Sequence, residues 1–347
     1  MLLTALTLLM TTSAPLGFSR NQDRVSGLVR WGAQVVVLAS RPCVLDLAAA
    51  TCAPVKVPGL DVVQTVAGDT TRFALGTTGG KPRVLRERAG TWSELETPAL
   101  GDAWDAITAG ASGERLAFVW SIVDRAPRPP RAQAGLALWD GARWTHAKLE
   151  HGSQGLPQVV RFIGGRWLFG YSCGEWGGSL WTLDAKGTPV RVLPELNDPV
   201  QALVPLPGGH ALVGTGLAHL STLSAEVGVL AADGGWTRLA KVDGFDGEKE
   251  ADQVRQNWTL KLDSLEGADI DAQGRVHVWT GSQGVARLDG ETMVVVTPGW
   301  PQDVHVYGRG MLLEGDLAVL ATFDGGVLLW KLGTTDYRRV PLLKPQR

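Results

Sequence analysis

The sequence has little of what marks several large protein classes. It contains three cysteines in 347 residues, too few for a fold held together by many disulfides. Its 33 basic and 35 acidic residues nearly cancel to a net charge of −2, so no long-range field favours nucleic acid or an anionic membrane. Beyond the first 20 residues no apolar run is long enough to span a bilayer. None of the HExxH, P-loop, DxDxDG or paired CxxC motifs occurs.

Glycine, proline and tryptophan are abundant by contrast. The chain has 44 glycines, 19 prolines and 14 tryptophans, and 44% of its residues are hydrophobic. Glycine supplies the positive φ angles that tight hairpins need, so this composition favours an all-β chain with many turns and a large core. The Ala-, Gly- and Arg-rich composition is typical of a bacterial protein.

The N-terminal segment indicates export. Residues 2–17 carry no charge and begin with an apolar run too short to span a bilayer, which is typical of a signal-peptide core. Cleavage after Ser19 would leave small residues at both recognition positions. We therefore expect residues 1–19 to be a signal peptide, residues 20–347 to form one domain, and the mature protein to be secreted or periplasmic. Since no Lys or Arg precedes the run, an apolar leading segment of a cytosolic protein remains the alternative.

Two of the cysteines flank a predicted hairpin. Asp46 to Ala49 form the expected loop, and counting outward from it places Cys43 opposite Cys52. Opposed positions on antiparallel strands bring Cβ atoms close to disulfide distance, so a disulfide fits, and it would agree with an oxidising compartment. The alternative is a pair of small apolar residues on one hairpin.

One pattern recurs seven times: an apolar strand, a short turn with Gly or Asp, and a second strand ending near Pro. The copies begin at residues 43, 83, 136, 179, 228, 284 and 327, a spacing of 40 to 56 residues that is typical of propeller blades. Two more strand-like runs precede most copies, such as 61–68 and 71–78, or 302–310 and 316–323. We therefore predict an all-β fold, a seven-bladed β-propeller of four-stranded antiparallel blades.

Residues 268–299 carry a resemblance to a known repeat. Asp271 and Gly274 match the Asp-x-x-Gly turn of the two-component-regulator propeller repeat, and residues 279–281 match its strand motif in altered order. Residues 73–80 and 320–326 resemble it more loosely. In that family such propellers are extracytoplasmic sensor modules. The resemblance implies the fold, the compartment and binding rather than catalysis, and it transfers no functional residue.

The predicted topology assigns the connections to two faces. If the strands of each blade are lettered A to D from the axis outward, the A–B and C–D turns share one face, and the B–C and D–A connections share the other. The three longest predicted connections, residues 121–135, 216–228 and 245–265, all fall on the second face. Long loops grouped on one side of a rigid scaffold are where binding usually occurs, although neutral insertion is the alternative.

Eight candidate binding residues lie in or near these connections. Arginines on a proline-stiffened loop can hold carboxylates or phosphates, and exposed tryptophans are enriched at interfaces. The alternatives are a solvated loop and tryptophans packed between blades. The candidates are Arg125, Arg128, Arg131, Trp104, Trp176, Trp258, Trp300 and His219.

The sequence favours binding over catalysis. The inner strands offer polar residues near the axis (Gln64, Asp105, Gln158, Gln201, Asp269 and Asp303), which could hold a cation or simply line a water-filled channel. We expect a binding or scaffold module for an envelope protein or polysaccharide, with no cofactor and no nucleic acid. The alternatives are a metal-assisted lyase or hydrolase at the axis, using His219 or His305 with axial carboxylates, and a purely structural subunit. The ligand's identity and the oligomeric state are left open.

Overall fold

The chain forms seven four-stranded antiparallel sheets, each built from four consecutive strands. The computed structural model describes residues 25–96, 106–124, 131–148, 156–172, 177–219, 222–242, 265–280, 284–289, 292–298, 308–322 and 326–342. Within these ranges the only helix is a single 3-10 turn, Pro207–Gly209, and no helix there is long and apolar enough to cross a membrane. The predicted fold class is confirmed.

The blades follow one another along the chain. Blades one and two comprise β1 (Gly27–Trp31), β2 (Gln34–Leu38), β3 (Cys43–Asp46), β4 (Thr51–Pro54), β5 (Val62–Ala67), β6 (Arg72–Thr78), β7 (Lys81–Arg88) and β8 (Thr91–Leu95). Blades three and four comprise β9 (Ala106–Ser112), β10 (Arg115–Asp124), β11 (Arg131–Trp139), β12 (Trp144–Lys148), β13 (Val159–Ile163), β14 (Arg166–Ser172), β15 (Gly178–Leu183) and β16 (Pro189–Val192). Blade five comprises β17 (Val200–Pro205), β18 (Ala211–His219), β19 (Thr222–Leu230) and β20 (Trp236–Val242). Blades six and seven comprise β21 (Leu265–Ile270), β22 (Val276–Thr280), β23 (Gly284–Asp289), β24 (Thr292–Val295), β25 (Gly308–Glu314), β26 (Leu317–Thr322), β27 (Gly326–Lys331) and β28 (Tyr337–Pro341).

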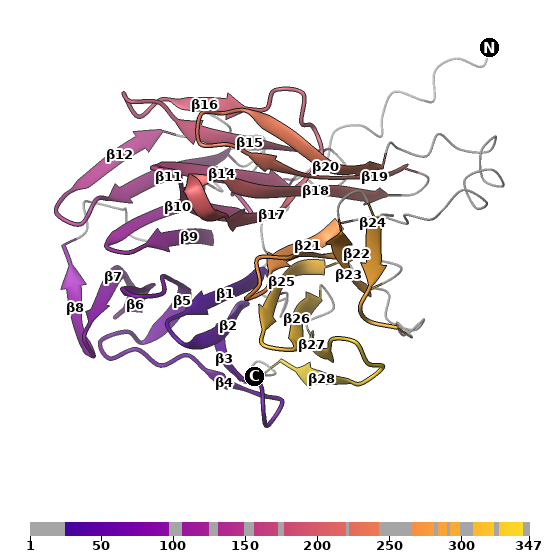
Figure 1. Ribbon diagram of the computed structural model, residues 1–347. Coiled ribbons are helices and arrows are strands. Elements are labelled where there is room, and N and C mark those ends of the chain that lie inside the picture. The colour runs from indigo at the N-terminus through magenta and orange to yellow at the C-terminus, as the bar shows by residue number, and fades with distance from the viewer. Residues whose placement is uncertain are drawn as a thin grey trace, which may run out of the picture.

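The first strand of each blade lies innermost, as predicted. β1, β5, β9, β13, β17, β21 and β25 each contact the next in turn, and β25 contacts β1, so the seven inner strands form a closed ring. The first and last blades are therefore neighbours, which Figure 1 shows as violet strands beside yellow ones. The face with the A–B and C–D turns is called the turn face below, and the opposite one the loop face.

The hydrophobic core is divided among the blade interfaces. Each of the seven interfaces holds its own cluster of buried residues. Alternate residues of the second strand point to opposite neighbours: in β2, Val35 and Val37 pack against blade seven while Val36 packs against blade two. Because both faces of a blade are covered, its central strands are apolar at nearly every position. Trp279 and Trp330 are fully buried in the cluster between blades six and seven.

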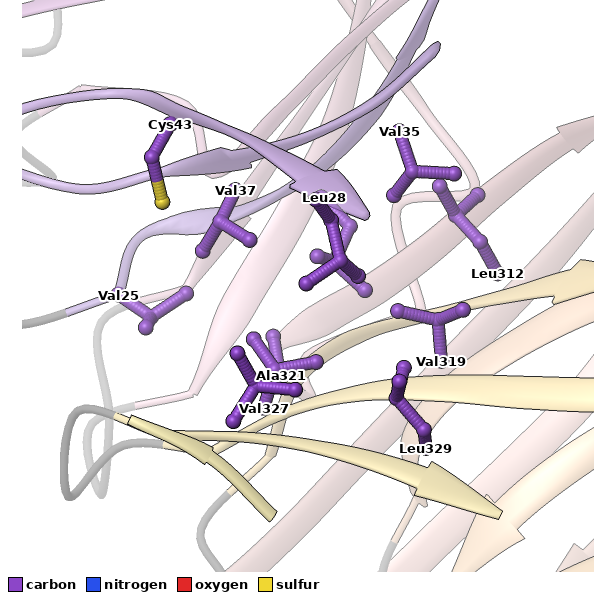
Figure 2. Packing of buried hydrophobic residues seen from close by; sticks show 12 residues of the cluster. Val25, Leu28, Val35, Val37, Cys43, Leu312, Val319, Ala321, Val327 and Leu329 are labelled. Carbon is purple, nitrogen blue, oxygen red and sulfur yellow. The ribbon is translucent and has the colours of Figure 1, made fainter. Parts of the chain in front are cut away.

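Side chains close the ring between blades one and seven. Figure 2 shows Val25, Leu28, Val35, Val37 and Cys43 of the first blade packed against Leu312, Val319, Ala321, Val327 and Leu329 of the last. On the outer edge β28 contacts β4, and Arg338 donates hydrogen bonds to the carbonyl oxygens of Leu47 and Ala48 at 2.7 and 2.8 Å. Every blade keeps its own four strands, so this interface closes by packing and side-chain contacts.

Cys43 and Cys52 are disulfide-bonded, with Cα atoms 5.6 Å apart. The predicted register of this hairpin was wrong by two residues. Cys52 lies opposite Leu45, and Cys43 lies opposite Pro54, so the bonded cysteines are diagonal neighbours. The turn is centred later than expected because Ala50 adopts a positive φ of 53° and ends the loop.

Three predicted segments differ from the structure. The prediction of a loop at residues 216–228 in blade five is wrong, because β18 and β19 extend through these residues as paired strands. The blade-three loop 121–135 is reduced to residues 125–130 by the extension of β10 and β11. The inner strand of blade seven is Gly308–Glu314 rather than 302–310, because a turn at Gly315, with a φ of 62°, pairs Glu314 with Leu317.

The Asp-x-x-Gly turn of blade six forms as expected. The Asp271 carboxylate accepts hydrogen bonds from the backbone N–H groups of Gln273 and Arg275, and Gly274 has a φ of 76°. The same arrangement recurs at Asp184, which accepts from the N–H groups of Lys186 and Thr188. Local Asp and Gly chemistry therefore sets these turns.

Candidate functional site

Most of the predicted binding residues cannot be placed. Arg125, Arg128, Trp104, Trp176, Trp258 and Trp300 lie outside the described residues, as do His305, Asp105, Asp303 and Cys173. Arg131 begins β11, opposite Asp124, and His219 ends β18, opposite Thr222. Both positions lie at the loop-face ends of their strands, so the backbone carries these two residues on the predicted face.

Two hairpins extend past their blades on the loop face. In blade five, residues 217–219 of β18 pair only with residues 222–224 of β19, beyond the ends of β17 and β20. In blade three, residues 122–124 of β10 pair only with residues 131–133 of β11, beyond the pairing with β9 and β12. Each extension is a two-stranded ribbon whose backbone edges have no further strand beside them among the described elements. Such edges can pair with an incoming chain.

The axis of the ring holds a cavity of about 130 Å³. It is lined by residues of the inner strands of blades one, three, four, five, six and seven, together with Ser26 and Gln158 just before two of these strands and Leu38 of β2. Gln158, Gln201 and Asp269, all expected near the axis, line it. Gln64 does not line it, and its Oε1 atom is buried with no hydrogen-bond partner in the described part of the chain.

Asp269 and Arg30 join three blades beside this cavity. Arg30 of blade one donates from Nη2 to Asp269 of blade six at 2.9 Å and to the carbonyl oxygen of Leu313 in blade seven at 2.6 Å. Its Nε donates to Glu314 at 2.8 Å. The Asp269 carboxylate also accepts from the N–H of Leu313 at 2.8 Å and is 3% exposed. Burial would lower the pKa of Arg30, but its two carboxylate partners raise it above its ordinary value.

Arg161 lines the same cavity, and no acidic side chain of the described residues lies at hydrogen-bond distance from it. It lies in β13 of blade four and donates from Nη1 to the carbonyl oxygen of Val160 at 3.0 Å. Burial lowers the pKa of its guanidinium. The negative charge of Asp269 partly opposes this effect, and the positive charge of Arg30 adds to it. Arginine nevertheless stays protonated in proteins, so the inner wall carries a cation.

An amide pair bridges two blades next to Arg161. Gln158 of blade four donates from Nε2 to Oε1 of Gln201 in blade five at 3.0 Å. Gln201 in turn donates to the carbonyl oxygen of Gly216 at 3.4 Å. Sequence reasoning found both glutamines but missed Arg30 and Arg161. The signal that could have found them is a charged side chain within the first strand of a blade.

The described residues offer no metal centre. No three His, Cys, Asp or Glu side chains gather there as metal ligands. Asp269 already accepts hydrogen bonds from Arg30, Leu313 and Ile270. Burial lowers the pKa of His277, whose Nδ1 atom lies 3.2 Å from the carbonyl oxygen of Arg275 and 3.9 Å from Asp271. This histidine lies in β22, just after the turn of blade six, and is not among the residues that line the cavity.

Residues 170–174, GYSCG, fit the GxSxG pattern and were not singled out from the sequence. In serine hydrolases that pattern occupies a sharp turn from a strand to a helix. Here Ser172 is the last residue of β14 and pairs with Gly178 of β15, so it lies in a regular blade strand. Ser172 therefore precedes a connection between two strands, whereas the serine of that pattern in a hydrolase lies at a turn from a strand to a helix.

No protein-family profile and no curated protein matches the chain. Solved structures do match. The Dos1 propeller is similar at a TM-score of 0.51 and 12% identity, over 91% of this chain and 82% of that one. Puromycin hydrolase is similar at a TM-score of 0.51 and 10% identity, over 92% of this chain and 55% of that one. An extracellular domain from B. thetaiotaomicron, BT4673, is similar at a TM-score of 0.48 and 12% identity, over 89% of this chain and 38% of that one.

The likeness is one of fold. At 10 to 12% identity, the matches to the Dos1 propeller and to puromycin hydrolase show a shared fold alone. The chain spans about half the length of puromycin hydrolase and less of the BT4673 chain. What this propeller binds must therefore be argued from its own residues.

Proposed function

We propose that this chain is an exported β-propeller that binds an envelope protein or polysaccharide through its loop face. The observation that carries the proposal is the pair of hairpins, β10–β11 and β18–β19, that extend beyond their blades on this one face. The turn face offers only short connections in the described part of the chain, such as residues 32–33 and 89–90. A rigid ring with protruding ribbons on one side is suited to presenting a broad contact surface.

Two features support an extracytoplasmic location. The uncharged apolar segment at residues 2–17 is typical of a signal peptide. The disulfide between Cys43 and Cys52 is the kind of bond that persists in oxidising compartments. We therefore propose that residues 1–19 are removed on export and that residues 20–347 act as one domain.

Shortening the two hairpins tests the binding face. Replacing residues 217–224 by Asn-Gly joins Gly216 to Ala225, and replacing 122–133 by Asn-Gly joins Ser121 to Ala134. Both pairs already lie opposite each other, so a two-residue turn fits the register. We expect the doubly shortened protein to retain its melting temperature and to lose capture of its partner from an envelope fraction, and of purified envelope polysaccharide.

A matched control is available on the turn face. Replacing residues 184–188 by Asn-Gly joins Leu183 to Pro189, which are also paired. This variant should capture the partner as well as the wild type does. Unchanged capture by the doubly shortened protein, or loss of capture by the control alone, would contradict the assignment.

The proposal for the loop face also assigns roles to the side chains that the sequence analysis identified. We propose that Arg125, Arg128 and Arg131 hold anionic groups of the partner, with Trp104, Trp176, Trp258, Trp300 and His219 supplying contact area. Substituting Arg128 and Trp258 by Ala should weaken capture while changing the unfolding free energy by less than about 0.5 kcal/mol. Thermal unfolding and capture, measured together, separate these two effects.

A further inference from the structure

Three arginines and one aspartate line the axial cavity. They are Arg30, Arg161, Arg309 and Asp269, in a chain whose net charge is −2. Asp269 and Glu314 both pair with Arg30, and among the described residues no acidic side chain is hydrogen-bonded to Arg161. Charge of one sign inside low-dielectric walls concentrates ions of the opposite sign.

Arg161 of β13 places one positive charge on the wall of the cavity. Arg30 is committed to Asp269, Glu314 and Leu313. Among the described residues, Arg161 has one hydrogen bond, to the neighbouring Val160 carbonyl, and it lines the cavity. A guanidinium has five N–H donors in a planar fork, so most of its hydrogen-bonding capacity is open to an incoming acceptor.

The rest of the wall fits an organic anion rather than a bare ion. Leu28, Leu203 and Met311 line the cavity beside the amides of Gln158 and Gln201. A space of about 130 Å³ is comparable to one that holds a small ring such as benzene. Apolar walls with a few convergent polar groups are the usual composition of a small-molecule site.

We propose that the axial cavity binds a small carboxylate, with the Arg161 guanidinium holding the carboxylate group in a bidentate pair. Such a fork-to-fork pair matches one negative charge to the Arg161 guanidinium, which has no acidic hydrogen-bond partner among the described residues. The same chemistry excludes a metal cation, which the surrounding arginines repel. The carboxylate can belong to a free organic acid, an acidic sugar or the C-terminal end of a peptide. This site is separate from the loop-face hairpins and goes beyond the binding function proposed above.

Isothermal titration of the wild-type chain at constant ionic strength distinguishes the three sources. The probes are lactate, galacturonate and N-acetyl-alanyl-alanine, each compared with its neutral form: lactamide, galacturonic acid methyl ester and N-acetyl-alanyl-alanine amide. Inorganic phosphate is the fourth probe. We expect saturable binding of at least one acid and no detectable binding of its neutral form. Equal binding of acid and neutral form, preference for phosphate over every carboxylate, or no binding of any acid would overturn the proposal.

A variant and its control locate the site. Arg161→Gln should raise the dissociation constant of the preferred acid by about 10-fold or more, the loss expected for a charged hydrogen bond. Arg143→Gln makes the same change in net charge on an outer turn, where Arg143 pairs with Asp140, and should leave the constant unchanged. Equal weakening in both variants would show a non-specific charge effect and overturn the assignment to Arg161.

The melting temperature of the Arg161→Gln variant gives a second measurement. Because Arg161 has no acidic hydrogen-bond partner in the described part of the chain, Arg161→Gln should not lower the melting temperature. If the variant does not fold, the comparison of acid with neutral form in the wild type still decides the proposal. The titrations use no envelope partner, so their outcome is independent of the capture experiments.

Discussion

At the scale of single residues, the Asp269 carboxylate links three blades. It accepts hydrogen bonds from Arg30 at 2.9 Å and from the N–H of Leu313 at 2.8 Å, and it is almost fully buried. Blade one therefore meets blades six and seven through one carboxylate and one guanidinium. Since no strand is exchanged between the described sheets of the first and last blades, these bonds contribute directly to closing the ring.

We expect Asp269→Ala to lower the free energy of unfolding by about 2–3 kcal/mol. The substitution leaves the Leu313 N–H buried without an acceptor and removes the partner of Arg30, whose partial exposure limits the cost. Urea denaturation measures the change. Asp316→Ala removes one partner of an exposed pair with Lys331 and should cost less than about 0.5 kcal/mol. Equal losses in the two variants would contradict a special role for Asp269.

His277 predicts a pH dependence of stability. Burial lowers its pKa below the ordinary value of 6.5, so the unfolded chain binds a proton more readily than the folded one. The contribution is complete above pH 6.5 and is lost as the pH falls toward the lowered pKa of the folded state. Denaturation between pH 7.5 and about pH 5 should show stability falling more steeply in the wild type than in His277→Gln. Parallel curves would show that His277 is not responsible.

At the scale of elements, the β3–β4 hairpin carries the disulfide. Cys43 is buried in the cluster between blades one and seven, so the covalent link fixes a hairpin that borders the closing interface. We expect the Cys43→Ser/Cys52→Ser double variant to lose about 2–3 kcal/mol of unfolding free energy, the value for a loop of this length. Dithiothreitol should lower the melting temperature of the wild type and leave that of the variant unchanged. An equal fall in melting temperature in the wild type and the variant would show that dithiothreitol acts at a site other than this disulfide.

The elements that the sequence predicted are those with local signals. Turns such as Asp184 to Thr188 and Asp271 to Arg275 are set by side chains within five residues, so the C–D repeat and the blade count could be found. The β18–β19 extension could not, because it depends on pairing across a two-residue connection that has neither Gly nor Pro. An expected turn at Asp46 to Ala49 shifted by one residue and changed the register of the whole hairpin.

The candidate site was predictable only in part. Gln158, Gln201 and Asp269 were expected near the axis because they lie in first strands of blades, and they line the cavity. Arg161 lies within the run VVRFI and reads as an ordinary outward-facing strand residue. A charge in the first strand of a blade could mark Arg161 as a candidate, but its place beside the cavity depends on six blades converging on one axis, which no local stretch of sequence contains.

At the scale of the whole molecule, the residues that stabilise the ring differ from those that we propose for binding. Seven interface clusters provide the core, and each involves two neighbouring blades. The loop-face ribbons lie beyond the four-stranded blades, and no other described strand pairs with them. Changes in the ribbons should therefore affect binding without loosening the ring, whereas changes at the closing interface should affect stability first.

Hydrogen–deuterium exchange of the wild-type chain, with and without the component that it retains from an envelope fraction, tests the binding face most directly. The account predicts slower exchange in residues 217–224 and 122–133 on addition of the partner, with no change in the turn-face residues 184–188 and 231–235. Protection confined to the turn-face residues, with the two ribbons exchanging as before, would contradict it.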